Sequence, residues 1–243
     1  MQKTVKILTI ACILLGFFLA LNYIQHASAD KQAYISITFD DGYSSQYHAA
    51  AVLENYDFKG TFYIPSALVE GEFEGKQLMN WSQITDLQAK GHEIGGHTAT
   101  HLKASSVSKD ECELDVIEGK KILEEHGISA ESFAYPYGDD SYKIAGSTFV
   151  TARTTKPCIN KLSAKELCGL TLVHQINEYK ILSVYLADLK LRGGWLVIVI
   201  HDISDNPRPD VDITNEEFEW ILNQIKNSGI PVKTIAEVVN ETA

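Results

Sequence analysis

The sequence has no basic stripe and no excess of positive charge. Its 21 Lys and Arg residues stand against 32 Asp and Glu residues, which gives a formal net charge of −11. A nucleic-acid binder needs clustered cations to neutralise phosphates. We therefore expect neither nucleic acid nor another polyanion among the partners of this protein.

Internal repeats and low-complexity linkers are also missing from the 243 residues. With 45% hydrophobic residues, the chain can bury enough apolar surface to offset the entropy of ordering. This composition excludes collagen-like, coiled-coil and broadly disordered chains. At about 100–200 residues per domain, the length predicts one domain, or two at most.

The N-terminal segment differs in composition from the rest of the chain. Two lysines precede an uncharged apolar run at residues 7–21, and Ala-Ser-Ala at 27–29 resembles a cleavage site. This pattern predicts a secretory signal peptide over residues 1–29. The alternative is an uncleaved membrane tether through residues 7–24, which are just long enough to cross a bilayer. In either case we expect the globular part, residues 30–243, to be secreted or extracytoplasmic.

Cysteine is scarce, with four residues in the chain. Cys12 lies in the predicted signal peptide. Cys158 and Cys168 are ten residues apart, and in an oxidising compartment we expect a disulfide between them that closes a small loop. Cys112 falls on the apolar face of a predicted helix, where free cysteine behaves as a small hydrophobic residue. We expect it to be a buried structural thiol.

Runs rich in β-branched and aromatic residues alternate along the chain with helical patterns. The predicted strands are residues 33–39, 60–64, 132–135, 147–151 and 195–200. The last of these runs is continuously apolar, as expected for a strand of a parallel sheet that helices cover on both faces. The alternation predicts an α/β fold, either a barrel or an open doubly wound sheet.

Helix-capping signals mark the starts of the predicted helices. Ser108 begins a capping box and a helix that ends near Gly127. Thr214 begins a second box and a helix that ends near Gly229. Ser82 is predicted to cap a shorter helix that precedes both and ends at Gly91.

Side chains capable of catalysis or metal binding follow several of the predicted strands. They are Asp40, Asp41, His97, His101, the Tyr-Pro-Tyr-Gly segment at 135–138, Arg153, His201 and Asp202. In parallel α/β folds the carboxyl ends of the strands lie on one side of the molecule. We therefore expect these residues to converge on a single site.

His97 and His101 are four residues apart, a spacing at which two imidazoles on one helical turn can share a metal. Asp41 would complete a set of two nitrogens and one carboxylate oxygen, which is common at catalytic zinc sites. No glutamate lies between the histidines, and this disfavours a zinc peptidase. The same set also holds iron in oxygenases, so the ligands alone leave the metal open.

Asp40 and Asp41 are adjacent and need separate roles, because successive strand residues point to opposite faces unless the chain turns. Gly42 permits such a turn. The alternative is that both aspartates cap the helix that follows.

Four ordered motifs carry a family resemblance. They are Thr-Phe-Asp-Asp-Gly at 38–42, His-Thr-Ala-Thr-His at 97–101, Tyr-Pro-Tyr-Gly at 135–138 and Ile-Val-Ile-His at 198–201. Together they resemble the polysaccharide deacetylases, carbohydrate esterase family 4. The resemblance implies a distorted (β/α) barrel with 7–8 parallel strands. It also implies a metal-dependent hydrolase that removes acetyl groups from a sugar, usually N-acetylglucosamine in a polymer.

The resemblance also implies a role for each matching residue. Asp41, His97 and His101 become the ligands of a divalent metal, with Zn²⁺ expected. Asp40 becomes the general base and His201 the general acid.

Several aromatic residues are expected at the substrate. The backbone N–H of Tyr137 is expected to donate to the oxyanion. The resemblance and the position of these residues beside the motifs predict substrate contacts for Tyr43, Tyr135 and Pro136. Tyr63, Tyr137 and Trp81 are further candidates for stacking on sugar rings, whereas Trp195 is expected in the core. His92 is expected to be structural.

The sequence departs from the family pattern at two places. Many members have an arginine where this chain has Ala134, and there it contacts the catalytic aspartate. We hypothesise that Arg153 reaches Asp40 from a different position. The family's aspartate-tryptophan motif is also missing, which leaves open what orients His201, because Asp202 would point away if the strand continued.

Three functions follow as candidates. The first is a secreted N-deacetylase of chitin, peptidoglycan or an exopolysaccharide. The second is an O-acetyl ester deacetylase that acts on acetylated xylan. The third is an inactive carbohydrate-binding barrel, against which the presence of all five aspartates and histidines of the predicted site argues.

Overall fold

The computed structural model describes residues 31–242. The predicted signal peptide or membrane tether lies outside these residues. Among residues 31–242, no helix combines the length and the apolar character needed to cross a membrane.

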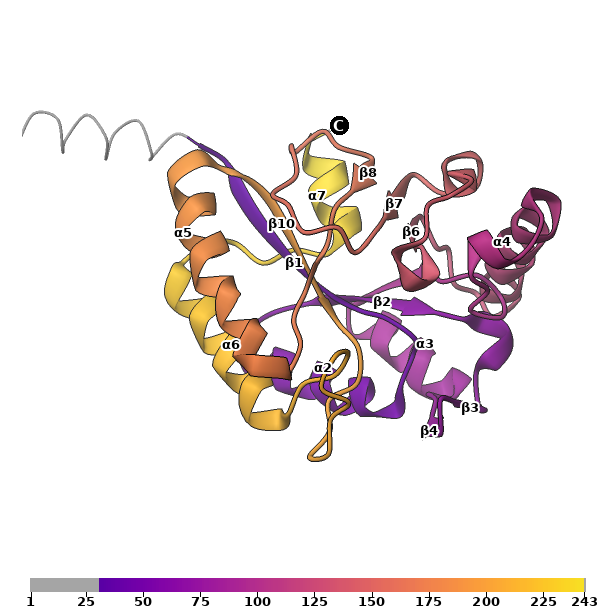
Figure 1. Cartoon of the computed structure of the whole chain (residues 1–243), viewed down its shortest axis with the longest axis horizontal. Coiled ribbons are helices and arrows are strands. Elements are labelled where there is room, and N and C mark those ends of the chain that lie inside the picture. The colour runs from indigo at the N-terminus through magenta and orange to yellow at the C-terminus, as the bar shows by residue number, and fades with distance from the viewer. Residues whose placement is uncertain (1–30, 243) are drawn as a thin grey trace, which may run out of the picture.

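A single eight-stranded parallel sheet forms the centre of the described chain (Figure 1). Its strands, in spatial order, are β8 (Glu166–Leu167), β7 (Thr151–Arg153), β6 (Ser132–Ala134), β5 (Glu93–Gly96), β2 (Gly60–Ile64), β1 (Ala33–Phe39), β10 (Gly194–Ile200) and β9 (Leu170–Thr171). Every neighbouring pair is parallel. Only Cys168 and Gly169 separate β8 from β9, so one short segment holds both ends of the sheet and curls it. The predicted distorted barrel of 7–8 parallel strands is confirmed.

Helices cover the outside of the sheet. They are α2 (Ser44–Glu54), α3 (Trp81–Ala89), α4 (Lys109–Glu125), α5 (Leu182–Arg192), α6 (Asn215–Ser228) and α7 (Ile235–Thr242). Helices α5 and α6 lie side by side along one flank, and α4 lies at the opposite end (Figure 1). A small antiparallel hairpin, β3 (Glu72–Phe73) with β4 (Lys76–Gln77), stands apart from the main sheet.

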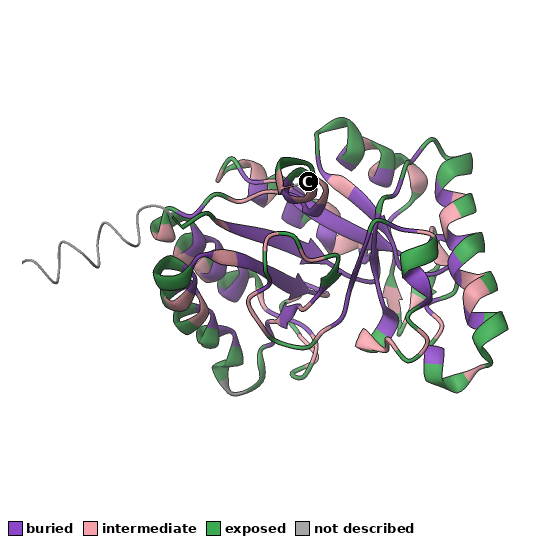
Figure 2. Cartoon of the chain, turned by 90° about the horizontal axis from the view of Figure 1, so that it is seen from above, coloured by how far each residue is buried: buried purple, intermediate pink, exposed green. Residues whose placement is uncertain are grey.

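The core is built on β1 and β10, which pair along their whole length. Residues 34–39 and 195–200 are all buried, as the continuous apolar run predicts, and Trp195 is in the core as expected. Burying a large aliphatic or aromatic side chain contributes about 1.5–3 kcal/mol, so these two strands anchor the fold. Exposed residues gather on the outer faces of the helices (Figure 2).

The capping predictions are confirmed for two helices and wrong for the third. Ser108 caps α4 and Thr214 caps α6, each in a full capping box. Helix α3 instead begins after Asn80, whose side chain accepts a hydrogen bond from the Gln83 N–H. Ser82 is the second residue of α3, two positions after the cap.

The strand predicted at residues 147–151 is also misplaced. Residues 144–147 form a short 3₁₀ turn (Ile144–Ser147), and β7 begins at Thr151. Phe149 packs on the rings of the core beside Phe133, with ring centroids 5.0 Å apart. Arg153 is therefore the last residue of a strand rather than a residue that follows one.

The cysteine predictions are confirmed. Cys158 and Cys168 form a disulfide, with their Cα atoms 5.6 Å apart. Cys112 is a free, buried thiol on the inner face of α4.

Candidate active site

The predicted site residues converge at the carboxyl ends of five parallel strands. Asp40 and Asp41 follow β1, His97 and His101 follow β5, Tyr137 follows β6, Arg153 ends β7 and His201 follows β10. Six of them, all but Arg153, line one pocket of about 320 Å³. The convergence predicted from strand order is present in the structure.

The two adjacent aspartates separate because the chain turns between them. Asp41 and Gly42 both have positive φ, +74° and +72°, so the Asp41 side chain departs from the alternation of β1. Tyr43 occupies the N-cap position of α2, and no side-chain cap bond is made there. The alternative that the two aspartates cap this helix is therefore wrong.

Asp41, His97 and His101 form a compact set of possible metal ligands. Asp41 Oδ1 lies 3.3 Å from His97 Nε2 and 3.0 Å from His101 Nε2. All three side chains are buried, and their ligand atoms lie within 4.8 Å of one another. Burial acts to raise the pKa of Asp41, but hydrogen bonds from the two imidazoles dominate and hold it well below its usual value.

The His-Thr-Ala-Thr-His segment is a turn, not the helical turn that its spacing suggests. Thr98 and His101 have positive φ, +61° and +58°. The loop still brings both imidazole rings together, with centroids 4.9 Å apart.

The three residues fit a divalent metal in both chemistry and orientation. His97 Nδ1 lies 2.7 Å from the carbonyl oxygen of Ala134, a partner that accepts the Nδ1–H and leaves the Nε2 lone pair directed at the cluster. Such outer partners fix the tautomer of metal-ligating histidines. Two imidazole nitrogens and a carboxylate oxygen suit zinc and also iron, so the donor set does not select the metal.

Asp40 is held by Arg153, whereas Asp41 contacts the two histidines. The guanidinium Nη2 donates to Asp40 Oδ1 in a fully buried ion pair. The guanidinium also lies over the ring of Tyr63, 5.1 Å from its centroid. The geometry predicted by the Arg153 hypothesis is therefore present in the structure.

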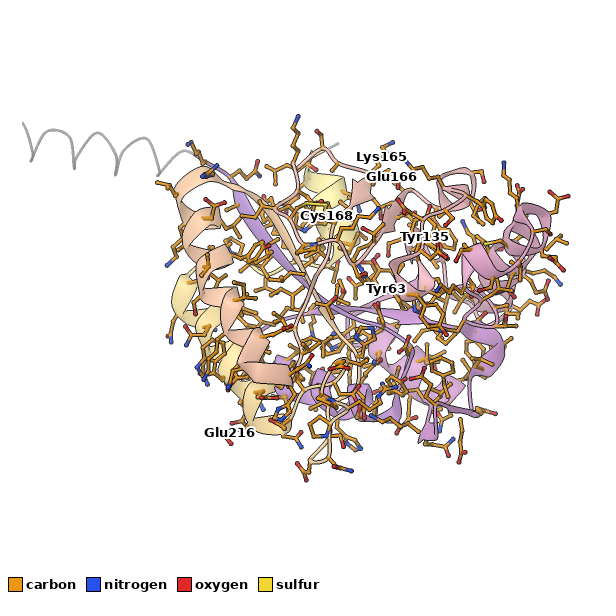
Figure 3. The ribbon with its side chains drawn as sticks, viewed as in Figure 1. Tyr63, Tyr135, Lys165, Glu166, Cys168 and Glu216 are labelled. Carbon is orange, nitrogen blue, oxygen red and sulfur yellow. A yellow bond between two sulfur atoms is a disulfide. The ribbon has the colours of Figure 1, made fainter. Side chains whose placement is uncertain are left out.

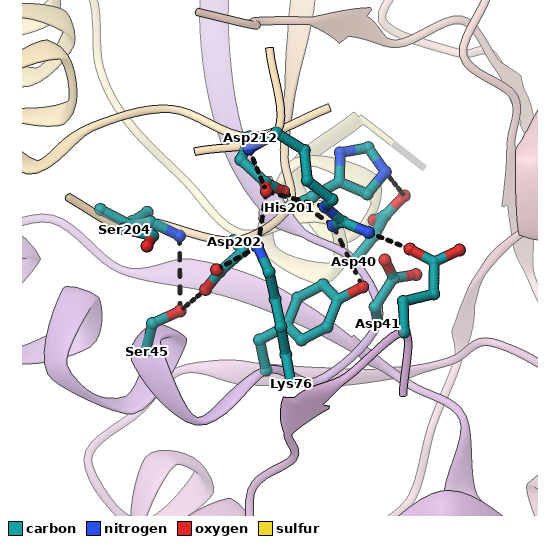
Figure 4. A network of polar contacts seen from close by, with 12 residues as sticks. Asp40, Asp41, Ser45, Lys76, His201, Asp202, Ser204 and Asp212 are labelled. Atoms are coloured by element: carbon teal, nitrogen blue, oxygen red, sulfur yellow. Dashed lines mark hydrogen bonds and ion pairs between the residues drawn. The ribbon is translucent and has the colours of Figure 1, made fainter. Parts of the chain in front are cut away.

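His201 lies on the other side of Asp40. Its Nε2 is 3.9 Å from Asp40 Oδ2 (Figure 4). Asp202 points away from the imidazole, as expected, and instead contacts Ser45 and Lys76. The buried Nδ1 of His201 has no hydrogen-bond partner among the described residues.

Gln46 is a site residue that the sequence analysis missed. Its buried side-chain amide donates to the main-chain carbonyl of Asp40 and, over 3.1 Å, to that of His201. One side chain thus joins the ends of β1 and β10. A glutamine within a helix carries no sequence signal for such a role, because the two carbonyls follow paired strand residues that are 161 positions apart in the sequence.

A second missed feature is a network of charged side chains beside the pocket, which ranges from the buried Asp212 to the exposed Glu74. Lys76 Nζ lies 2.6 Å from Asp202 Oδ2 and also contacts Asp212 (Figure 4). Arg208 pairs with Asp212 and with Glu74. These pairs tie the β3–β4 hairpin to the loop that follows β10.

Three side chains predicted to contact the substrate, those of Tyr43, Tyr135 and Pro136, are buried and do not line the pocket. Tyr43 is 1% exposed and lies beneath Lys76 and Arg208, whose cationic groups are 5.6 and 5.5 Å from its ring centroid. Tyr135 packs against Phe133, and Pro136 is also buried.

The aromatic residues predicted to stack on sugar rings fall into two groups, those away from the pocket and the one that lines it. Tyr63 and Tyr135 lie in the interior (Figure 3), and Trp81 stacks on His126. Tyr137 is 56% exposed and lines the pocket, with its ring 4.7 Å from that of His101. Tyr137 is thus the one of these candidates that lines the pocket.

His92 is structural, as expected. Its Nδ1 accepts a hydrogen bond from the Gly60 N–H at 3.1 Å. It lies at the start of β5, away from the pocket, and burial lowers its pKa to about 4.

Comparison with known proteins assigns the chain to a family. The family described as polysaccharide deacetylase matches residues 27–150, about half of the chain. The chain belongs to the polysaccharide deacetylase family, a class of hydrolases.

Relatives of known name are similar over part of their length. A gellan lyase of a Bacillus species is 29% identical over 206 residues, which cover 75% of this chain but 8% of that protein. A peptidoglycan-N-acetylglucosamine deacetylase of Bacillus cereus is 32% identical over 104 residues, or 42% of this chain and 45% of that protein. The chain thus spans less than half the length of either relative.

Solved structures share the fold at low sequence identity. The Xyl-CE4 domain of a multidomain xylanase from the hindgut metagenome of Trinervitermes trinervoides has a TM-score of 0.59 and 17% identity. A family 4 acetyl xylan esterase from Clostridium thermocellum, in complex with cobalt, has a TM-score of 0.59 and 19% identity. In each case the match covers 86% of this chain and 91% of the other.

Proposed function

We propose that this protein is an exported, metal-dependent hydrolase that removes acetyl groups from N-acetylglucosamine units of a polysaccharide such as chitin, peptidoglycan or an exopolysaccharide. One observation carries the proposal. The carboxylate of Asp40, paired with Arg153, lines one pocket together with a three-ligand cluster and the imidazole of His201. This is the set of groups that amide hydrolysis requires.

Asp41, His97 and His101 would hold the metal, with Zn²⁺ as the expected ion. When bound, such a cation polarises a carbonyl and lowers the pKa of a water molecule toward about 7. Asp40 accepts the proton of the attacking water, while the Arg153 guanidinium balances its negative charge. The backbone N–H of Tyr137 donates to the oxyanion that develops on the acetyl carbonyl oxygen.

His201 completes the reaction by protonating the leaving group. An amine is expelled poorly unless it carries a proton, and an imidazole can supply one near neutral pH. Because Asp40 and His201 lie on adjacent strand ends, base and acid act on the same substrate from β1 and β10. We propose residues 30–243 as the catalytic domain.

The choice of an N-acetyl substrate is supported by the relative named as a peptidoglycan-N-acetylglucosamine deacetylase. The same groups would also hydrolyse an O-acetyl ester on xylan, where the alcohol leaves more readily. An inactive barrel is disfavoured, because Arg153 supplies the cation that Ala134 does not.

Release of acetate tests the proposal. The substrates are N-acetylated chitooligosaccharides, peptidoglycan and acetylated xylan, each with and without a chelator and with Zn²⁺ restored. We expect release from the N-acetylated glycans that the chelator abolishes and Zn²⁺ restores. Preference for acetylated xylan would support an O-acetyl esterase instead. If no substrate released acetate, the proposal would be overturned.

Variants assign the roles within that assay. Asp40→Asn and His201→Ala should each lose about 10²–10⁴-fold in turnover, the usual contribution of a general acid or base. Asp57→Asn is a matched control, since the Asp57 carboxylate is 94% exposed and pairs only loosely with Lys226 at 3.8 Å. Near-normal turnover in both site variants would refute the assignment.

Export is supported by two features. One is the N-terminal pattern of residues 1–29, and the other is the Cys158–Cys168 disulfide, because disulfides persist in oxidising compartments. N-terminal sequencing of the protein from culture medium and from membranes tests this. A chain that begins at Asp30 in the medium is the expected result, whereas an intact N-terminus in the membrane fraction would favour the tether.

A further inference from the structure

The two histidines of the metal-ligand cluster are held in different ways. His97 Nδ1 lies 2.7 Å from the carbonyl oxygen of Ala134. The Nδ1 atom of His101 is also buried, but it has no hydrogen-bond partner among the described residues. Metal-ligating histidines almost always donate their second N–H to an outer partner that fixes the orientation of the ring. A contact other than a hydrogen bond must therefore hold the His101 imidazole toward Asp41.

Two aromatic rings that line the pocket contact the His101 imidazole. The ring of Phe73, in strand β3, has its centroid 4.5 Å from that of His101, at an interplanar angle of 57°. The ring of Tyr137 lies 4.7 Å away. Phe73 is the nearer of the two and is half-buried, whereas Tyr137 is 56% exposed. Tilted ring pairs at this distance attract each other, so the Phe73 ring restricts the orientations open to the imidazole.

The hairpin that carries Phe73 needs contacts elsewhere to hold this position. Strands β3 and β4 pair with each other and not with the main sheet, and an isolated two-stranded hairpin is marginally stable in water at best. Beyond β4, the Met79 N–H donates to the carbonyl oxygen of Gly42 over 2.9 Å, which attaches the hairpin beside the cluster. At the tip, Glu74 and Gly75 both have positive φ, as in a tight two-residue turn.

Two cations hold the hairpin against the loop that follows β10. Lys76, in β4, pairs with Asp202 and Asp212 (Figure 4). Arg208, in the loop, pairs with Glu74 at the tip of the hairpin and with Asp212, where 2.8 Å separates Nη2 from Oδ1. Asp212 is fully buried and contacts both cations. It therefore links the hairpin to the loop through charge-assisted hydrogen bonds, which are stronger than neutral ones.

We propose that Phe73 is a positioning residue for the metal ligand His101, and that the ion pairs of Lys76 and Arg208 keep Phe73 in place. The hairpin thus contributes to the affinity for the divalent cation without supplying a ligand to it. This inference rests on the metal dependence in the proposed function. It deepens that function, because it assigns part of the metal affinity to residues outside the three ligands.

Titration of the metal-free protein with Co²⁺, followed by visible absorption, tests the inference without any substrate. Loss of the outer partner of a metal-ligating histidine typically costs about 10–100-fold in metal affinity. We expect Phe73→Ala to raise the Kd for Co²⁺ by about tenfold or more and to change the absorption spectrum of the bound ion. Phe73→Tyr keeps the ring and should retain the native Kd and spectrum. Glu72→Gln is the matched control, since Glu72 is exposed in the same strand and does not line the pocket.

Arg208→Met separates positioning from simple charge effects. If electrostatic repulsion alone acted, loss of a positive charge near the cluster would tighten cation binding. If the ion pairs keep Phe73 in place, the same change weakens binding, and we expect the Kd for Co²⁺ to rise about tenfold. Arg192→Met is the matched control, because it removes the same charge from an exposed pair with Asp188 on α5 and should keep the native Kd.

Thermal unfolding of the metal-free variants checks that each is folded during the titration, and Arg208→Met decides the matter if Phe73→Ala unfolds. A native Kd in Phe73→Ala, or an unchanged or lower Kd in Arg208→Met, would overturn the inference and leave the proposed function intact. A native protein that binds no Co²⁺ would overturn both. If no glycan released acetate, the proposed function would fail, but weaker Co²⁺ binding by the two variants than by their controls would still support the inference.

Discussion

Arg153 lies directly opposite Ala134 in the parallel pairing of β6 and β7, and its guanidinium donates to the Asp40 carboxylate. The cation that the family resemblance places at position 134 thus comes from the neighbouring strand at the same level of the barrel. The carbonyl of Ala134 meanwhile holds the His97 imidazole. Strands β6 and β7 together thus hold one residue of the metal-ligand cluster, His97, and the neighbouring carboxylate of Asp40.

Replacing Arg153 with methionine should reduce both stability and activity. The pair with Asp40 is fully buried, and removing one partner of a buried ion pair costs about 3–5 kcal/mol, because the other charge is left uncompensated. Urea unfolding and acetate release measure the two effects. Arg192→Met is the control, since Arg192 makes an exposed pair with Asp188 and such pairs contribute about 0–1 kcal/mol. Equal behaviour of the two variants would contradict the role of Arg153.

Replacing Gln46 with leucine should lower kcat and leave KM nearly unchanged. The change removes the amide that joins the carbonyls of Asp40 and His201 and lets the two strand ends shift. Misplacement of catalytic groups by about 1 Å can cost about 10²-fold in rate.

Steady-state kinetics of the folded variant provide the measurement. Gln88→Leu, on the exposed side of α3, should match the native enzyme. A Gln46 variant that loses stability but keeps its kcat would show that the residue supports the fold alone.

The candidate site could be predicted from the sequence because its members lie in short local motifs directly after strands. Asp40, Asp41, His97, His101 and His201 needed only the order of the strands to be brought together. Tyr43 could not be placed in the same way. It follows the same motif, but Lys76 and Arg208 cover its ring from the β3–β4 hairpin and the loop after β10, and local sequence carries no trace of that contact.

The boundary of β7 was misplaced for a similar reason. Phe149 and its β-branched neighbours favour a strand locally, yet Phe149 packs against Gly96, where a Cβ atom would come within 2.5 Å of the ring. Tertiary packing therefore overrides the local preference. The positive φ of Thr98 likewise occurs in a turn that packs on other elements, since the Thr98 carbonyl accepts a hydrogen bond from the Ser66 N–H.

The folded protein should become less stable as the pH falls, over a pH range set by the titration of His92. Burial lowers its pKa in the folded protein to about 4, whereas a histidine in an unfolded chain titrates near about 6.5. The unfolded state therefore binds this proton first as the pH falls. The stability is fully present above about pH 6.5 and is lost progressively toward about pH 4, by up to about 3 kcal/mol.

Urea unfolding between pH 7 and pH 4 measures this effect. His92→Asn keeps an acceptor near the Gly60 N–H and should flatten the decline in that window. His48→Asn, on the exposed face of α2, should keep the native profile. An unchanged decline in the His92 variant would assign the acid sensitivity to other groups.

The metal content of the purified protein tests the central claim most directly. Elemental analysis should find about one divalent ion per chain in the native protein and in His48→Ala. In His97→Ala the ion should be lost along with acetate release, because the Nε2 that faces Asp41 is gone. A native protein that releases acetate without bound metal, or a His97→Ala variant that keeps its full metal content, would contradict the account.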